Sequence, residues 1–485
     1  MKGKNDAKKE MPVLSDLGQL AQSMYIRMVP SYGNSFFFTI GVYLLELFVI
    51  LAVSGMIMLI FGPYWWDLTA AGSFLRSVHL WAAEAFVTLM LLHLFVNFST
   101  SAFKRKKLIW AIGSVMLMLV LLQFAFGVGI AGGLLSQWND KAGADLWNGL
   151  GLGYWVNPLN NGAVLGWHVA IIPLLLAVLM FVHYSLVKKK GISRPYRKDI
   201  PYHMVPTDHG KMYRRMAYVF IIVLLFGVFF RVPYVPPLTI AEAANSHPDN
   251  TATTILNEFN YSSGTAVYND TIDPYTFSTR QVYVTIPYMT LINLTHSENY
   301  EANFLSLNST EQRLLMAAAF SYFSDNGSVA NGTTSTNPLI SVASSLTLMA
   351  ESGAYQSAVQ DESASGLNYT YVIRFLFDSG ALQGAASKYG MRVSQFGMLN
   401  VAKQPWYIQY WLLPYNLLEI STSGISWWGD LENGILATAA FIVLLAFPFI
   451  PYLNELPDRL GLYKLFWNRF TVPEMRKRTK NRIRK

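Results

Sequence analysis

The stretch HLWAAEAFVTLMLLH at residues 79–93 decides the fold, together with HVAIIPLLLAVLMFVH at residues 168–183. Each is an apolar run with a histidine at both ends, and the histidines are 14 and 15 residues apart. In a helix these spacings equal roughly four turns, or about 21–22 Å, so both histidines lie near one face at two depths. Because a histidine inside a lipid-spanning helix is costly, each one marks a functional site.

The composition places these helices in a membrane. The chain has 485 residues, of which 52% are hydrophobic and 14% are charged, and this balance is typical of a lipid environment rather than of soluble domains. Six stretches are long and apolar enough to cross about 30 Å of hydrocarbon. They cover residues 36–61, 77–98, 108–130, 164–187, 215–232 and 434–453.

The basic residues predict the orientation. Of the 37 Lys and Arg residues, 28 fall in the N-terminal segment, two of the loops and the C-terminal tail, which share one side if the six spans alternate. Basic segments stay in the cytoplasm, so both termini are expected inside a plasma membrane. The first thirty residues are polar and basic, so no cleavable signal peptide is expected. The net charge of +8 is therefore a sign of topology, and no nucleic-acid partner is expected.

Between residues 234 and 402 the composition changes to Ser, Thr, Asn, Gly and Tyr, which is typical of an exported globular insert. We expect an α+β fold, with a strand at residues 281–287 and helices at 311–323 and 341–350. A protective or partner-docking cap is the simplest role. Seven Asn-x-Ser/Thr acceptors predict glycosylation on the outer side: Asn260, Asn269, Asn293, Asn308, Asn326, Asn331 and Asn368.

The two histidine-bearing helices run in the same direction, because one span separates them. His79 is then level with His168 near the outer surface, and His93 is level with His183 near the inner surface. Two facing imidazoles are the ligands of a six-coordinate haem that transfers electrons. Hydrogen bonding across helices or a proton path is the alternative for any single histidine. Zinc or copper would require ligands gathered at one depth, and the absence of cysteine excludes disulfides and c-type haem attachment.

Glycines repeat with the same spacing in the neighbouring spans. Gly41 and Gly55 are 14 residues apart, as are Gly113 and Gly127. A flat macrocycle between helices needs positions where no side chain intrudes, and glycine provides them. Ordinary close packing of membrane helices is the competing explanation for any one of them.

Together these features resemble cytochrome b of the quinol-oxidising cytochrome bc complexes. The resemblance covers most of residues 30–235 and resumes at about 403–470. The segment SFLRSVH at residues 73–79 is similar to the family's Arg-x-x-His opening, where the arginine meets a haem propionate, so the resemblance gives Arg76 that role. Segments 190–195 and 199–203 resemble the inner quinone region, which makes His203 a candidate there.

The sequence departs from the family in four respects. The family's Pro-Glu-Trp-Tyr motif, whose glutamate accepts a quinol proton, reads Gln-Pro-Trp-Tyr at residues 404–407. The outer loop at residues 132–138 also differs, and the last two spans of the long family form are missing. The insert has no counterpart in the mitochondrial or chloroplast proteins, and it points to a divergent archaeal member.

The resemblance implies quinol oxidation near the outer surface, a Rieske iron–sulfur partner, two b-type or modified haems, quinone reduction near the inner surface, and a terminal oxidase or other acceptor. A homodimer is also implied. Trp406 and Tyr407 would line the outer site, where Glu84 and Glu419 are candidate proton acceptors in place of the missing glutamate. One alternative is a di-haem anchor that passes electrons directly from quinol to an attached oxidase. The other is a cofactor-free glycosylated transporter or assembly protein.

The expected architecture is an all-α transmembrane chain, built around a di-haem four-helix bundle at residues 36–187. An N-terminal segment at 1–35 carries a surface helix at about 14–28. A cytoplasmic loop and the fifth span follow the bundle at 188–233. The outer quinol segment and the sixth span occupy 403–453 after the insert, and a basic tail completes the chain at 454–485.

Overall fold

The computed structural model describes residues 26–192, 203–231, 234–271, 277–325, 328–360, 367–392, 417 and 429–466. The chain divides into two compact units. The first comprises Met1–Leu121, Leu174–Arg231 and Ala440–Lys485, and the second comprises Leu122–Pro173 and Val232–Ala439. Residues 14–25 of the predicted surface helix lie outside the described residues. The motif at residues 404–407 lies outside them as well.

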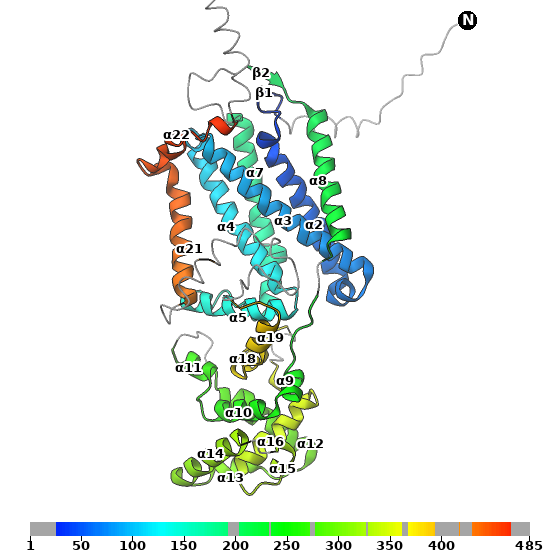
Figure 1. The fold of residues 1–485 in the computed structure, drawn as a ribbon, viewed down its shortest axis with the longest axis vertical. Coiled ribbons are helices and arrows are strands. Elements are labelled where there is room, and N and C mark those ends of the chain that lie inside the picture. Colours follow the sequence, from blue (N-terminus) through cyan, green and yellow to red (C-terminus); the bar gives the residue numbers. More distant parts are fainter. Residues whose placement is uncertain are drawn as a thin grey trace, which may run out of the picture. The chain divides into compact units, whose positions relative to one another are not determined.

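Long apolar helices dominate the first unit, where they lie side by side (Figure 1). Among the described residues, five helical segments are long and apolar enough to cross a membrane, and a bent pair, Gly434–Phe449 with Leu453–Arg459, would make a sixth. Five of the six predicted spans are therefore confirmed in position, the sixth corresponds to the bent pair, and the chain is a multi-pass membrane protein. The spans are α2 (Phe36–Leu68), α3 (Ala70–Ser99), α4 (Lys107–Gly129), α6 with η2 and α7 (Asn161–Lys190), α8 (His209–Phe229) and α21 (Gly429–Ala446).

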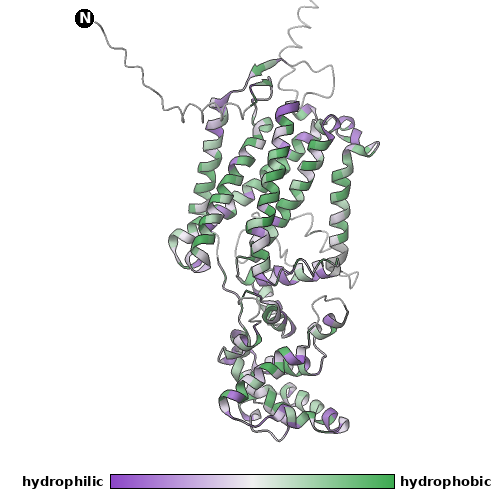
Figure 2. Ribbon diagram, turned by 180° about the vertical axis from the view of Figure 1, so that it is seen from behind, coloured by the Kyte–Doolittle hydropathy of each residue, from purple (hydrophilic) through white to green (hydrophobic). Residues whose placement is uncertain are grey.

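Hydrophobic residues predominate along these helices, as the hydropathy colouring of Figure 2 shows. Ile60, Phe181 and Phe229 are exposed, which suits contact with lipid rather than water. Local sequence sets the helix ends. Gly62 with a φ of 75° breaks α2 before Pro63, and the hydroxyl of Thr69 accepts a hydrogen bond from Gly72 to cap α3.

The remaining elements of the first unit are short. Strands β1 (Met28–Pro30) and β2 (Met204–Pro206) pair antiparallel. The carboxylate of Asp208 caps α8 by accepting from Lys211 N. Asp458 accepts from Ser101 and Lys104, which ties the segment after α21 to the turn after α3. The other short helices are η1 (Ala102–Lys104), η7 (Phe447–Phe449), η8 (Leu453–Glu455) and α22 (Leu456–Arg459).

The regular secondary structure of the second unit is helical in its described residues, apart from a single bridge between Asn160 and Asn368. Its core joins the insert to segments from the membrane half of the chain, since Leu134, Ala144 and Leu159 belong to the same apolar cluster as the insert helices. The elements are α5 (Leu134–Gly149), α9 (Ile240–Ser246), α10 (Pro248–Phe259), α11 (Gly264–Thr271), η3 (Gln281–Thr285), α12 (Ile286–Thr295), α13 (Tyr300–Leu305), α14 (Ser309–Ser324), α15 (Val329–Gly332), α16 (Pro338–Glu351), α17 (Ala354–Val359), α18 (Thr370–Asp378) and α19 (Ala381–Lys388).

The predicted strand at residues 281–287 is wrong. The segment forms the π-helical turn η3 and the start of α12. Tyr283, Val284 and Tyr288 are all buried, and this helical spacing lets them face one core. The hydroxyl of Tyr355 also donates to the Tyr283 carbonyl at 2.6 Å. Tertiary packing therefore outweighs the β propensity of the alternating Val and Tyr residues. The helices predicted at 311–323 and 341–350 are confirmed as parts of α14 and α16.

Candidate functional site

The four span histidines lie on α3, η2 and α7. His79 and His93 are on α3, His168 is in the π-helical turn η2 (Trp167–Ile171), and His183 is on α7. All four side chains are half-buried. Within the first unit, His93 and His183 are close enough to interact electrostatically. His79 belongs to the first unit and His168 to the second.

Each of the four repeated glycines faces one of these histidines. A Cβ added at Gly55 would lie 3.2 Å from Cε1 of His79, and one at Gly127 would lie 2.7 Å from Cε1 of His168. At the other ends of the same helices the distances are longer but the pairing is the same. Gly41 would place a Cβ 3.9 Å from His93 Cε1, and Gly113 would place one 3.7 Å from His183 Cε1. The glycines thus make room for the imidazole rings.

A reciprocal pair of hydrogen bonds orients His168. Its Nδ1–H donates to the backbone carbonyl of Gln123 at 2.9 Å, and the Gln123 side-chain amide donates to the His168 carbonyl at 2.7 Å. A carbonyl oxygen can only accept, so the proton resides on Nδ1. Nε2 is therefore the unprotonated nitrogen, which is the form that a metal requires.

Ser54 has the corresponding role at His79. Its hydroxyl donates to the Ile50 carbonyl at 2.7 Å, and its oxygen lies 2.8 Å from His79 Nδ1. Since the hydroxyl proton is engaged with Ile50, the oxygen accepts the proton of Nδ1. His79 is thereby held in the same tautomer as His168, with Nε2 as the atom that can bind iron.

The side chains of the inner histidines, His93 and His183, make weaker hydrogen bonds than those of His79 and His168. The amide of Asn97 lies 3.3 Å from His93 Nε2 and donates to the His93 carbonyl at 2.8 Å. The Nδ1 of His183 is buried without a full hydrogen bond and lies toward the backbone of Ile109. Ile109 precedes Gln123 by one 14-residue repeat, so His183 and His168 face equivalent positions of α4.

The residues present fit a bis-histidine haem. Each imidazole is accessible in part, each is backed by glycine, and in two cases the hydrogen bonds leave Nε2 as the ligand atom. In the part of the chain that the structure describes, no three His, Asp or Glu residues gather into a metal-binding group. A haem needs only two protein ligands for its iron, whereas a structural zinc site takes four.

Sequence reasoning missed Ser54, Gln123 and Asn97 as partners of the histidines. Each is a polar residue in an apolar span, and that is the signal that could have found them. Ser54 directly precedes Gly55, and Gln123 lies one helical turn before Gly127.

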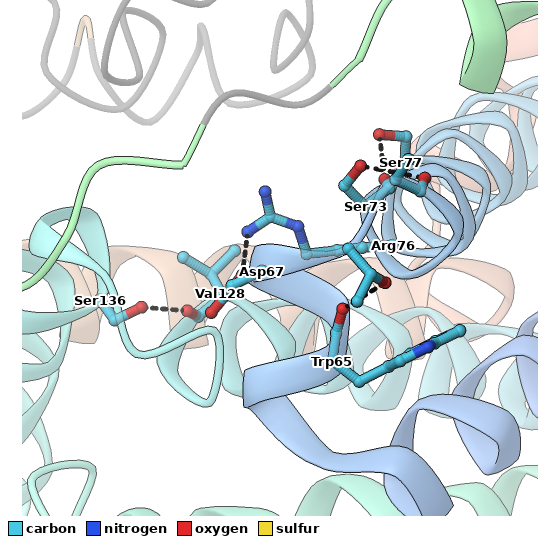
Figure 3. A network of polar contacts seen from close by, with 9 residues as sticks. Trp65, Asp67, Ser73, Arg76, Ser77, Val128 and Ser136 are labelled. Carbon is cyan, nitrogen blue, oxygen red and sulfur yellow. Dashed lines mark hydrogen bonds and ion pairs between the residues drawn. The ribbon is translucent and has the colours of Figure 1, made fainter.

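Arg76 has a protein partner in this structure. Its guanidinium forms an ion pair with Asp67 at 3.0 Å, as Figure 3 shows. Both side chains are largely buried, at 14% and 11% exposure, which strengthens the pair relative to one in water. The propionate role expected for Arg76 would require the guanidinium to serve two acidic groups, which its five N–H donors allow.

The structure describes two of the five candidate residues for quinone chemistry. Glu84 is buried on α3, five residues after His79. His203 is exposed beside β2, and its carbonyl accepts from Ser31 N at 2.8 Å. Trp406, Tyr407 and Glu419 lie outside the described residues.

The predicted glycosylation sites differ in exposure. Asn260, Asn293, Asn308 and Asn331 are exposed, whereas Asn368 is half-buried. Asn269 is buried, and its amide donates to the Phe277 carbonyl at 3.2 Å. The structure therefore disfavours Asn269 as an acceptor. Asn326 is not among the described residues.

Known proteins match the histidine-bearing part of the chain. Residues 84–239 match the sequence profile described as "Cytochrome b(N-terminal)/b6/petB". Cytochrome b6 of Chlamydomonas reinhardtii is 31% identical over 137 residues, which cover 26% of this chain and 63% of the relative. Cytochrome b6 of Heliomicrobium gestii is 27% identical over 208 residues, covering 37% of this chain and 95% of the relative.

A solved structure is also similar. A chain of "Hyperthermophilic respiratory Complex III" aligns with 73% of this chain and 98% of its own length, with 19% identity and a TM-score of 0.39. At that score the assignment rests on the sequence matches. The profile match includes His93, His168, His183, Gly113 and Gly127, and this part of the chain is similar to cytochrome b6 and to the N-terminal part of cytochrome b.

Proposed function

We propose that this protein is the di-haem subunit of a respiratory quinol-oxidising complex and transfers electrons across the membrane. The observation that supports this most directly is the fourfold pairing of glycine with histidine. All four repeated glycines face all four span histidines, one to one. Packing alone would not require every glycine of the repeat to meet an imidazole.

The chain's own residues would hold two b-type haems as His79 with His168 and His93 with His183. Bound haem iron supplies one-electron redox chemistry at each level of the membrane. With two histidine ligands each, the haems would be suited to electron transfer rather than to the binding of a gas. Ser54 and Gln123 fix the outer histidines in the tautomer that presents Nε2, and Arg76 would neutralise a propionate.

Quinol is the proposed electron donor near the outer surface. Trp406 and Tyr407 would line that site, with Glu84 or Glu419 accepting a proton. One electron would pass to a Rieske iron–sulfur partner and then to a terminal oxidase or another acceptor. The other would cross the two haem levels and reduce quinone near His203 on the inner side.

The proposed setting is the cell membrane, with both termini in the cytoplasm and the insert outside. The distribution of basic residues supports this orientation. The exposed Asn-x-Ser/Thr sites of the insert are the proposed points of glycosylation. A second copy of the chain would complete the family's homodimer.

The experiment is a quinol-dependent reduction assay on the purified native complex, combined with pyridine haemochrome quantification. Two haems per chain, both reduced by quinol, are expected. A preparation that contains folded protein and no haem would reject the proposal in favour of a cofactor-free transporter or assembly protein.

A second candidate keeps both haems and omits the division of electrons at the outer site. The observation that favours it is Pro405, which stands where the family has its proton-accepting glutamate. In that case the chain is an anchor that passes electrons directly to an attached oxidase. An inhibitor of the inner quinone site would then leave haem oxidation unchanged, whereas it would block oxidation of the inner haem in a complex that divides electrons.

A further inference from the structure

A cleft of about 340 Å³ opens in the second unit, between the turn before α6 and the segment before α18. This volume is at the lower end of the range for small-molecule sites. Four aromatic rings line it: Tyr154, Trp155, Phe277 and Tyr371. Phe277 and Tyr371 pack together with ring centroids 4.7 Å apart. Tyr154 and Trp155 are 68% and 65% exposed, and their rings meet edge to face with centroids 5.6 Å apart.

Three asparagines and a threonine supply the polar lining. Asn157 accepts from Leu159 N through Oδ1, and its amide donates to Thr370 Oγ1 at 3.2 Å. Asn160 caps α6 by accepting from Ala163 N. The Oδ1 of Asn368 accepts from both the backbone N and the hydroxyl of Thr370, at 3.1 and 2.5 Å. The amide oxygens therefore hold the walls of the cleft.

Two of these lining residues, Asn368 and Thr370, are the ends of one glycosylation sequence, Asn368-Tyr369-Thr370. The bonds to Thr370 are made by the oxygen of Asn368, whereas N-glycosylation modifies the nitrogen. Among the sequons that the structure describes, this one alone has its asparagine and its threonine in the cleft lining. Its sugar would begin inside a cleft that already presents exposed aromatic faces.

We propose that an N-linked glycan on Asn368 occupies this cleft and packs its first sugar rings against Tyr154 and Trp155. In the transfer step, the Asn368 amide nitrogen bonds to C1 of the first sugar and gives up one proton, and the lipid diphosphate of the oligosaccharide donor leaves. A pyranose presents C–H groups on one face, and large aromatic rings bury such surface readily. The proposal rests on the insert being outside the membrane.

The glycan would cover a junction that the backbone already forms. Asn161 N donates to the Leu367 carbonyl and Tyr369 N donates to the Leu159 carbonyl, both at 2.9 Å. These bonds tie the turn before α6 to the segment before α18. A sugar at Asn368 would exclude water from this junction and order the exposed Tyr154 and Trp155.

The test combines glycopeptide mass spectrometry with hydroxyl-radical footprinting of the full native protein. Wild type is expected to carry sugar on Asn368 and to show slow oxidation of Tyr154 and Trp155. Asn368→Gln should raise that oxidation several-fold. Thr370→Ser keeps the sequon and should behave like wild type. Asn293→Gln removes a different, exposed sequon and should leave the oxidation of both aromatic residues unchanged.

An unmodified Asn368 would overturn the proposal. A modified Asn368 with no change of oxidation in Asn368→Gln would overturn the placement in the cleft. Protection that survives Asn368→Gln would mean that another occupant, such as a free saccharide or a quinone, fills the cleft. The haem content of the same samples is measured in parallel, so a missing haem counts against the electron-transfer function and not against the glycan.

Discussion

At Gly127 the structure leaves no room for even one methyl group. An added Cβ would lie 2.7 Å from His168 Cε1, which forces the imidazole to move. Alanine is otherwise favoured over glycine inside a helix by roughly 0.5–1 kcal/mol, so any loss in Gly127→Ala reflects the histidine. We expect this variant to lose one of two haems in a pyridine haemochrome assay.

Gly41→Ala is the matched control, because its Cβ would lie at an ordinary contact distance of 3.9 Å from His93 Cε1. It should keep both haems. If the two variants retain equal haem, the close contact of Gly127 with His168 is unimportant.

Ser54 tests the hydrogen bond that holds His79. Removing an outer partner of a metal-binding histidine typically costs about 10–100-fold in affinity. Ser54→Ala should therefore release one haem more readily. It should also raise that haem's midpoint potential, because an imidazole that loses its acceptor becomes a poorer electron donor to ferric iron. A redox titration measures both effects.

Ser114→Ala provides the comparison, since Ser114 is a buried serine next to Gly113 whose hydroxyl has no hydrogen-bond partner. Its midpoint potentials should match those of wild type. Equal potentials in Ser54→Ala and wild type would contradict the assigned tautomer of His79.

At the scale of elements, the insert contains a buried acid on α10. Burial raises the pKa of the Glu258 carboxyl to about 9, and the nearby Asp378 carboxylate adds to the shift. Ser263 donates to it at 2.7 Å, and the phenols of Tyr283 and Tyr355 also face it. The folded insert therefore holds a proton that the unfolded chain releases above pH 4.5.

The raised pKa of Glu258 sets the direction in which pH changes the stability of the insert. The folded pKa is the higher one, so the stability contribution is complete below about pH 4.5 and is lost as the pH rises through about 9. Melting of the insert, followed by circular dichroism, should occur at progressively lower temperature between pH 5 and 9. Glu258→Gln should flatten this dependence, whereas Glu351→Gln on α16 should preserve it. A flat profile in wild type would contradict the buried proton.

A second prediction at the scale of elements concerns which asparagines of the insert carry sugar. Asn269 is buried and bonded to Phe277, so a glycan there would require the fold to open. Glycopeptide mass spectrometry should find it unmodified, while Asn260, Asn293, Asn308 and Asn331 carry sugar. Full occupancy at Asn269 would show that α11 is arranged differently in the mature protein.

Elements were predictable where one physical force dominates. The spans followed from hydropathy, because lipid requires long apolar helices. The segment at 281–287 did not follow, because its Val and Tyr residues suit a strand locally and only the contacts with Tyr355 and Phe375 select the helix. Helix α5 was missed for a similar reason. Its Leu134 and Ala144 are buried only because the insert packs against them.

At the scale of the whole molecule, one boundary between the units falls between Arg231 and Val232, close to the insert boundary expected at residue 234. The second unit takes in Leu122–Pro173 as well as the insert, because α5 and the turn before α6 share the insert's core. The candidate site was more predictable than the fold. Spacing alone predicted the four histidines and the four glycines as separate sets, and the structure adds that each glycine faces one histidine. The contacts of Ser54 and Gln123 depended on which helices become neighbours.

The central claim is that two pairs of histidines each hold a haem. The most direct measurement is a dithionite-reduced minus oxidised spectrum, with haem quantification, of wild type, His93→Ala, His168→Ala and the control His203→Ala. Two low-spin haems are expected in wild type and in His203→Ala, and one in each of the other variants. No haem in wild type, or two haems in either span variant, would contradict the paired assignment.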